Sequence, residues 1–293
     1  MDANEMNLAA YTRHLRARNR SAGTIAGYRD AIQSLAARHG NADVLGLDAA
    51  AVDDYLIDLL GRVAATTAGI HYRSLRAYYN WAVREQIIDR SPMAGMAEPK
   101  PTNKPVPVIP DADLQRLLAA CSGADFEARR DGAVIRLWCE PGSPRVAEMA
   151  ALTLADLDLR HDQITVCGKG DKIRVIPFGA KTGTAVDRYL RQRARHKQAK
   201  LDALWLGPRG PLTVSGLAQM LRRRCRQAEV GHIHPHQLRH TAAHVWADSG
   251  GSDQDAMVLF GWSSPSMPRL YGRSAGEERA RRAARRASLG DRL

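Results

Sequence analysis

The sequence lacks the features that define several large protein classes. Its four cysteines are widely spaced and form no Cys-x-x-Cys pair, so they indicate neither a zinc ribbon nor a disulfide-rich scaffold. We expect all four to be buried free thiols in a reducing compartment. No apolar run approaches the roughly 18 residues of a membrane span, and the first residues, MDANEMNLAA, do not resemble a signal peptide. No GxxxxGK[ST] phosphate-binding loop is present. A cytoplasmic protein without a nucleotide cofactor is expected.

Acidic residues are the minority among the charged ones. The chain has 43 Lys and Arg against 31 Asp and Glu, which gives a net charge of +12. This balance favours a polyanionic partner, because each phosphate that Lys or Arg neutralises releases condensed counterions. The alternative, from charge alone, is a basic cytoplasmic protein that has no role with nucleic acid.

Length and patterning predict two domains. The 293 residues, of which 44% are apolar, correspond to about two ordinary domains with substantial cores. Residues 1–98 show only helical periodicity, as in "SLRAYYNWAV". Five prolines between residues 99 and 110 predict an extended linker. Residues 111–293 are mixed: "QITVCGKGDKIRVIPF" predicts a β-hairpin, and the remainder is mostly helical and ends in a basic, Arg/Ala-rich tail.

Four of the ten histidines lie in one short segment, "HPHQLRHTAAH", at residues 234–244. On a helix, His236, His240 and His244 would share one face, as metal ligands could. A metal would also need a nearby carboxylate or thiolate, whereas this segment carries Arg239, whose charge opposes a dication. A metal site is therefore disfavoured. Taken alone, the segment is most simply a polar helix with one or two core histidines.

Three further segments carry residue types that are used in catalysis. Arg145 and Glu148 are one helical turn apart in "PGSPRVAEMA", where a simple ion pair would also explain them. Lys169 lies at the tip of the predicted hairpin, a place where lysines are ordinarily solvated. In "LFGWSSPSMPRLYGR", Trp262 precedes Tyr271, and a tyrosine considered singly is more often a core residue than a nucleophile.

Together these segments resemble the tyrosine site-specific recombinases, the phage integrase, Xer and Cre-like family. Four of them occur in the family's order and spacing: G-x-x-R-x-x-E at 142–148, G-K-G at 168–170, H-x-x-R-H-T at 236–241 and L-x-G-W-S-S…Y at 259–271. The pattern Ser21…Thr24…Tyr28 and "LRAYYNWAVREQIIDRSP" resemble the family's core-binding domain, so the resemblance covers nearly the whole chain.

The resemblance implies a mainly α fold with a small antiparallel β-sheet in the catalytic domain. The two domains would form a C-shaped DNA clamp: an all-α, SAM-like core-binding domain at residues 1–98, a proline-rich linker at 99–110 and a tyrosine recombinase catalytic domain at 111–293 that includes the basic tail. The implied activity is strand cleavage and rejoining through a 3′-phosphotyrosyl intermediate, used for DNA integration, excision or resolution.

The resemblance also implies roles for the candidate residues. Arg145 and Arg239 match the family's two arginines, and a planar, always charged guanidinium suits the charge that develops on a phosphoryl group. Tyr271 matches the nucleophile. A tyrosine hydroxyl with a pKa near 10 needs help to lose its proton, and His236 matches the residue placed nearby. Lys169 matches the general acid that protonates the leaving 5′-oxygen.

Three other positions match the family's site without a proton-transfer role. Trp262 stands where many members have histidine and where Cre-like members also have tryptophan, and both side chains offer an N–H group. Glu148 and His240 match supporting positions, whereas His244 matches no functional position.

One departure concerns the loop before Arg145. The family usually has a three-residue Thr-Gly-hydrophobic turn there, whereas this chain has Pro141-Gly142-Ser143-Pro144, which is one residue longer. This loop is expected to orient Arg145 differently and to slow cleavage.

The resemblance implies double-stranded DNA as the partner, four protomers on two DNA sites and an accessory directionality factor. No cofactor and no metal are expected, because the phosphotyrosine stores the cleaved bond. The tail beyond Tyr271 would dock on a neighbouring protomer or, alternatively, bind DNA directly as a basic helix. No room for an extra DNA-binding domain exists before Asn7, which favours a recombinase that needs only core sites. Two alternatives remain: relaxation of DNA by a type IB topoisomerase-like enzyme, and a catalytically inert DNA-binding protein on the same scaffold.

Overall fold

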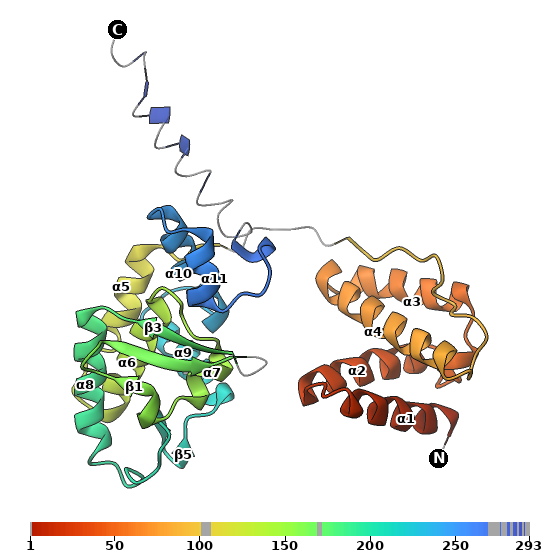
Figure 1. Ribbon diagram of the computed structural model, residues 1–293, viewed down its shortest axis with the longest axis horizontal. Helices are drawn as coiled ribbons and strands as arrows, with labels where there is room; N and C mark the ends of the chain where they lie inside the picture. The colour runs from red at the N-terminus through yellow and green to blue at the C-terminus, as the bar shows by residue number, and fades with distance from the viewer. Residues whose placement is uncertain are drawn as a thin grey trace. The chain divides into compact units, whose positions relative to one another are not determined.

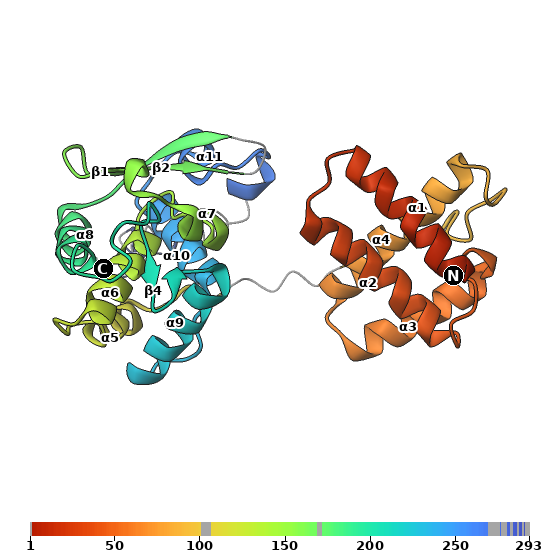
Figure 2. The ribbon, with the colours of Figure 1, turned by 90° about the horizontal axis from the view of Figure 1, so that it is seen from below.

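The computed structural model (Figures 1 and 2) describes residues 2–100, 107–168, 172–268 and a few single positions between 276 and 290. The chain divides into two compact units, residues 1–104 and 105–293. Both units are mainly helical, and the only strands of the described residues form small antiparallel sheets in the second unit. The predicted fold class, mainly α with a small antiparallel sheet, is confirmed.

The first unit is a bundle of helices whose starts are fixed by side-chain caps. It contains α1 (Ala3–Ala17), α2 (Ala22–Arg38), the 3₁₀ turn η1 (Val44–Gly46), α3 (Ala49–Arg62) and α4 (Ala65–Arg84). Asp2, Ser21 and Asp48 accept hydrogen bonds from backbone N–H groups in the first turns of α1, α2 and α3. Such caps satisfy donors that have no partner inside the helix.

An aromatic cluster forms much of the core of this unit. The ring of Tyr11 lies 5.2 Å from that of Tyr78 and 5.1 Å from that of Trp81, and the latter two rings are stacked. The chain beyond α4 packs back on this helix, because the Tyr72 hydroxyl donates to the carbonyl oxygen of Met96 and Met93 is buried. The stripe of apolar residues predicted for α4 therefore faces the core.

The second unit packs helices around a three-stranded sheet. Its elements are α5 (Asp111–Ala119), α6 (Phe126–Cys139), α7 (Val146–Ala151), η2 (Leu154–Asp156), β1 (Leu157–Asp158), β2 (Gln163–Cys167), β3 (Ile173–Pro177), α8 (Ala180–Arg193), β4 (Leu206–Gly207), β5 (Gly210–Pro211), α9 (Val214–Gln227), α10 (Pro235–Asp248) and α11 (Asp253–Phe260). The sheet order is β1-β2-β3, all antiparallel. In Figure 2 this sheet lies along one side of the unit and α9 along the opposite side.

The predicted β-hairpin is confirmed as β2 and β3. Cys167 pairs with Ile173, and the backbone N–H of Gly168 donates to the carbonyl oxygen of Lys172 at 2.9 Å, which closes the turn. Residues 169–171 lie outside the described residues, and so does the predicted basic tail apart from single positions.

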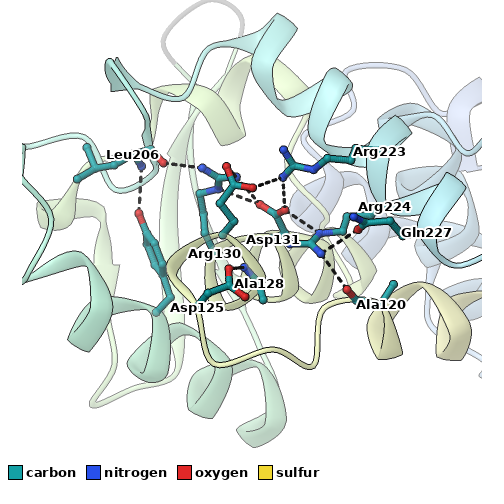
Figure 3. A network of polar contacts seen from close by, with 11 residues as sticks. Ala120, Asp125, Ala128, Arg130, Asp131, Leu206, Arg223, Arg224 and Gln227 are labelled. Atoms are coloured by element: carbon teal, nitrogen blue, oxygen red, sulfur yellow. Dashed lines mark hydrogen bonds and ion pairs between the residues drawn. The ribbon is translucent and has the colours of Figure 1, made fainter.

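A buried ionic network fastens α6 to α9 (Figure 3). Asp131, at the centre, is fully buried and accepts hydrogen bonds from the guanidinium groups of Arg130 at 2.8 Å, Arg224 at 2.8 Å and Arg223 at 2.9 Å. Removing one partner from a buried ion pair costs about 3–5 kcal/mol, because a charge is left uncompensated. The network thus fixes α6 against α9. Helix α7 packs on α9 and helix α10 packs on α6, so both are supported by this pair of helices.

One prediction about the cysteines is wrong. Cys121 and Cys225 are buried, but Cys139 is only half-buried and Cys167 is exposed. Cys167 ends β2, where side chains alternate between the two faces of the sheet, and its neighbour Val166 takes the buried face.

Within the described ranges, no helix is both long and apolar enough to cross a lipid bilayer.

Candidate active site

Arg145 is held at the start of α7 by a single carboxylate. Its backbone N–H donates to Oε2 of Glu148 at 2.8 Å, and its Nη1 donates to Oε1 of the same residue at 2.8 Å. Its Nη2 donates to the carbonyl oxygen of Gly261 at 3.3 Å. The side chain is 41% exposed, so the guanidinium is oriented by protein groups and is still open to solvent on one side.

Glu148 binds a second arginine. Its side chain is 6% exposed, and Arg174 on β3 donates to both of its oxygens, at 3.2 and 2.7 Å. Burial alone would raise the pKa of Glu148, but hydrogen bonds from Arg174 and from the backbone and side chain of Arg145 bring it down to about 2. The carboxylate is therefore charged at neutral pH and holds two guanidinium groups.

Arg239 is almost completely buried in α10, and it is surrounded by carbonyl oxygens. Its Nη1 donates to Gly142 at 3.3 Å and to Ser143, its Nη2 donates to Phe260, and its guanidinium lies 5.2 Å from the centre of the Phe260 ring. The loop at 141–144, which is longer than the family's turn, supplies two of these acceptors. Gly142 has a φ of +89°, and a Cβ there would lie 3.0 Å from the carbonyl oxygen of Leu259, so this position requires glycine.

Three arginines meet the same end of α11. Arg174 Nε donates to the carbonyl oxygen of Leu259 at 2.9 Å, Arg239 to that of Phe260 and Arg145 to that of Gly261. The last carbonyl groups of a helix have no partner inside it and carry partial negative charge. Guanidinium groups from α7, β3 and α10 are thus brought to three consecutive residues, which concentrates positive charge in one place.

His236 and Trp262 lie close to these arginines. His236 is exposed in the first turn of α10. Desolvation by the surrounding protein lowers its pKa from the ordinary value, and the charges of Arg239 and Arg145 lower it further. The ring therefore lies within electrostatic reach of both arginines. Trp262, which follows the end of α11, is buried and stacks on Phe260, with ring centres 4.8 Å apart.

The remaining predicted residues divide into two groups. His240 is buried in α10 directly after Arg239, and His244 is half-buried one turn later. Among the residues that the structure describes, no group of three His, Cys, Asp or Glu side chains could hold a metal ion. Lys169 and Tyr271 lie outside the described residues, so their roles stay predictions.

No role was predicted for Arg174, which the structure places at the centre of the site. It reads as one residue of an ordinary strand, "IRVIP". The signal was present in the register: Arg174 shares its face with Ile176, which is fully buried, whereas Ile173 and Val175 face outward. An arginine on the buried face of a strand needs partners.

The sequence model of the phage integrase family matches residues 107–278. The chain belongs to this family. It is 32% identical over 282 residues to the tyrosine recombinase XerC of Azotobacter vinelandii, which covers 91% of both chains. It is 30% identical over 260 residues to the tyrosine recombinase XerC of Corynebacterium efficiens, which covers 86% of this chain and 81% of the relative.

The fold is similar to that of the XerH site-specific recombinase bound to palindromic difH substrate in a post-cleavage complex. The TM-score is 0.75 at 18% identity, and the match covers 94% of this chain and 82% of the other. The family match and the two XerC relatives show that the protein is a site-specific tyrosine recombinase, an enzyme that binds, cleaves and rejoins DNA. The family membership favours recombination over the two alternatives, topoisomerase-like relaxation and an inert DNA-binding protein.

Proposed function

We propose that the recombinase cleaves a DNA strand at a phosphate bound jointly by Arg145 and Arg239. The phenolic oxygen of Tyr271 attacks the phosphorus, and the bond from phosphorus to the 5′-oxygen breaks. The products are a 3′-phosphotyrosyl linkage and a free 5′-hydroxyl, and attack by a new 5′-hydroxyl reverses the step. The observation that carries this proposal is the convergence of the two arginines on the adjacent carbonyls of Gly261 and Phe260.

Two protons must move in this step. His236 accepts the proton of the Tyr271 hydroxyl, and Lys169 donates a proton to the leaving 5′-oxygen. The lowered pKa of His236 supports its part, because a ring that is neutral at physiological pH can accept a proton. Lys169 directly follows Gly168 in the sequence, and a Cβ on Gly168 would lie 3.1 Å from Oε1 of Glu148, which supports a role for Lys169 near the arginines.

Three other residues shape the site. The indole N–H of Trp262 donates to a phosphoryl oxygen, which adds a neutral donor to the two charged ones. Glu148 orients Arg145, and its bidentate contact with that residue supports this role. His240 supports Arg239, its neighbour on α10. No nucleotide or metal cofactor takes part.

We further propose how the two units act on DNA. Residues 1–98 form a core-binding domain, residues 99–110 a linker across the duplex, and residues 111–293 the catalytic domain, together making a C-shaped clamp. Four protomers act on two core sites and integrate, excise or resolve DNA, with an accessory factor to set direction, and the basic tail docks on the neighbouring protomer. The reaction takes place on the nucleoid in the cytoplasm, which the bacterial origin of the relatives supports.

The test begins with the target sequence. Duplexes that the full-length protein binds are selected from a random library, and the selected site is rebuilt with a nick that lets a short fragment diffuse away after cleavage. The wild type should accumulate a covalent DNA adduct that a protease removes, and Tyr271→Phe should give none.

Tyr78→Phe is the matched control. The hydroxyl of Tyr78 is buried without a hydrogen-bond partner in the described part of the chain, so its removal should leave the adduct unchanged. An equal adduct with Tyr271→Phe would show that another residue is the nucleophile, and no adduct with the wild type would refute the proposed cleavage.

A further inference from the structure

Arg174 directly joins three parts of the site, the strand β3, the helix α7 and the end of α11. Its residue is 8% exposed, on the inward face of β3. Its Nη1 and Nη2 bind both oxygens of Glu148 on α7, at 3.2 and 2.7 Å, and its Nε binds the carbonyl oxygen of Leu259 on α11, at 2.9 Å. Three N–H groups of one rigid, planar guanidinium thus fix the spacing of β3, α7 and α11.

Two glycines from separate motifs lie against this guanidinium. A Cβ on Gly168, at the end of the described part of β2, would lie 3.4 Å from Nη1 of Arg174 and 3.1 Å from Oε1 of Glu148. A Cβ on Gly261, at the end of α11, would lie 3.2 Å from the same Nη1. The G-K-G and L-x-G-W motifs therefore each place a glycine against the contact between Arg174 and Glu148, where a Cβ would crowd Oε1 of Glu148 or Nη1 of Arg174.

Each segment that Arg174 joins carries a group assigned to cleavage. Glu148 holds Arg145 through both its backbone and its side chain. The end of α11 accepts from Arg239 at Phe260 and leads directly into Trp262. Lys169, which lies outside the described residues, precedes β3 by four residues in the sequence. A change at Arg174 would move these groups relative to one another while each kept its own chemistry.

We propose that Arg174 is a positioning residue for strand cleavage. It sets the distance between the ion pair of Arg145 and Glu148 at α7 and the end of α11, which leads into Trp262. The inference rests on the proposed function, because it takes Arg145, Arg239 and Trp262 as the groups that bind the phosphate. Arg174 itself does not touch the DNA. Its loss should therefore reduce the rate constant of cleavage at saturating DNA and leave the DNA concentration for half-maximal rate nearly unchanged.

The experiment compares Arg174→Lys and Arg174→Gln with a matched control, Arg193→Gln. Arg193 is also buried, and it binds the carbonyl oxygens of Leu204, Ala199 and Ala203 at 3.1, 3.2 and 2.8 Å. Its loss should lower thermal stability without touching the site. Cleavage of the nicked substrate is measured over a range of DNA concentrations, at a temperature where all variants are folded by circular dichroism.

Arg174→Gln should cleave about 10- to 100-fold more slowly at saturating DNA, the size of effect that a misplacement near 1 Å produces. The half-maximal concentration should change less than about threefold, since phosphate contacts that set affinity stay in place. Arg174→Lys should fall between Arg174→Gln and the wild type, because an ammonium keeps the charge but does not span Glu148 and Leu259 together. Arg193→Gln should cleave at the wild-type rate.

A second variant tests the same contact from the other side. Gly168→Ala should slow cleavage in the wild-type background, where its Cβ would lie 3.1 Å from Oε1 of Glu148 and would disturb the bond that Arg174 makes to this oxygen. It should add little to Arg174→Gln, in which that bond is already lost. Equal saturating rates for Arg174→Gln and Arg193→Gln, or fully additive effects of Gly168→Ala, would overturn the inference. Both of these results require that the wild type forms a covalent DNA adduct. If the wild type forms no adduct, the proposed function is refuted instead, so failure of the inference and failure of the proposed function are distinguishable.

Discussion

The backbone N–H of Ile109 donates to Oγ1 of Thr241 at 3.1 Å, in a buried environment. Thr241 lies two residues after Arg239, so the end of the proline-rich region is attached to the helix of the candidate active site. A second contact, from Nε2 of Gln237 to the carbonyl oxygen of Pro107 at 3.3 Å, lies on the same helix. Residues 107–109 are therefore attached to α10 by two hydrogen bonds.

Thr241→Val keeps the shape of the side chain and removes the acceptor. The buried N–H of Ile109 would then have no partner, and we expect a loss of about 1–3 kcal/mol in the free energy of unfolding. Thr184→Val is the control, because the hydroxyl of Thr184 is exposed and binds only its own helix; its effect should stay within about 0.5 kcal/mol. Urea unfolding measures both, and equal effects would mean that the contact of Ile109 contributes nothing.

Glu148→Gln tests the charge at the centre of the site. The pKa of this carboxyl group is about 2 in the folded chain, below its ordinary value of 4.5. Its contribution to the free energy of unfolding is therefore present above pH 4.5 and is lost as pH falls toward 2. A difference of this size corresponds to roughly 3 kcal/mol. Glu148→Gln should thus be less stable than the wild type at pH 7, and the gap should narrow between pH 5 and pH 3. A gap that is the same at all pH values would contradict this assignment.

The pH dependence of cleavage should report His236. Its pKa is lowered by desolvation and by the charges of Arg239 and Arg145, so the ring loses its proton at a lower pH than an ordinary histidine. Cleavage at saturating DNA should rise as pH increases through a pKa below about 6.5 and should level off by neutral pH. His236→Gln should lower the plateau and abolish this rise. If the variant keeps the same acidic limb, another group accepts the proton.

Trp262 offers a test of one hydrogen-bond donor. Trp262→Phe keeps an aromatic ring against Phe260 but removes the indole N–H, and it should slow cleavage by roughly 100-fold, as the loss of a single donor to a developing oxyanion does. Trp262→His keeps an N–H and should cleave much faster than Trp262→Phe. The measurement is the rate of adduct formation, and equal rates for the two variants would show that Trp262 acts through packing alone.

Local sequence patterns were sufficient for most of the fold. Ser21 and Asp48 cap the helices they precede, and β2 pairs with β3 as the predicted hairpin, because caps, periodicity and hairpin pairing depend on residues close together in the chain. Six of the eight predicted site residues are described by the structure, and Arg145 and Arg239 meet at one helix end.

What could not be predicted depends on contacts between distant segments. Arg174 is separated from Glu148 by 26 residues and from Leu259 by 85, and no local pattern relates them. The effect of the loop at 141–144 on Arg145 stays a prediction, and the binding of its carbonyl groups to Arg239, which is 96 residues from Ser143, was not expected. Cys167 was expected in the core but is exposed. The face on which its side chain lies depends on the register of β2 against β3, which the local sequence does not specify.

The most direct measurement compares the wild type with Arg145→Ala on two substrates that differ in one charge. In one substrate the scissile phosphate is unmodified; in the other it is a methylphosphonate, which lacks the negative oxygen that a guanidinium would neutralise. On the phosphate, we predict that Arg145→Ala cleaves about 100- to 1,000-fold more slowly than the wild type. On the methylphosphonate, this ratio should fall by at least about tenfold, because less charge develops. An equal ratio on both substrates would contradict the account, since Arg145 would then act on something other than the charge of the cleaved phosphate.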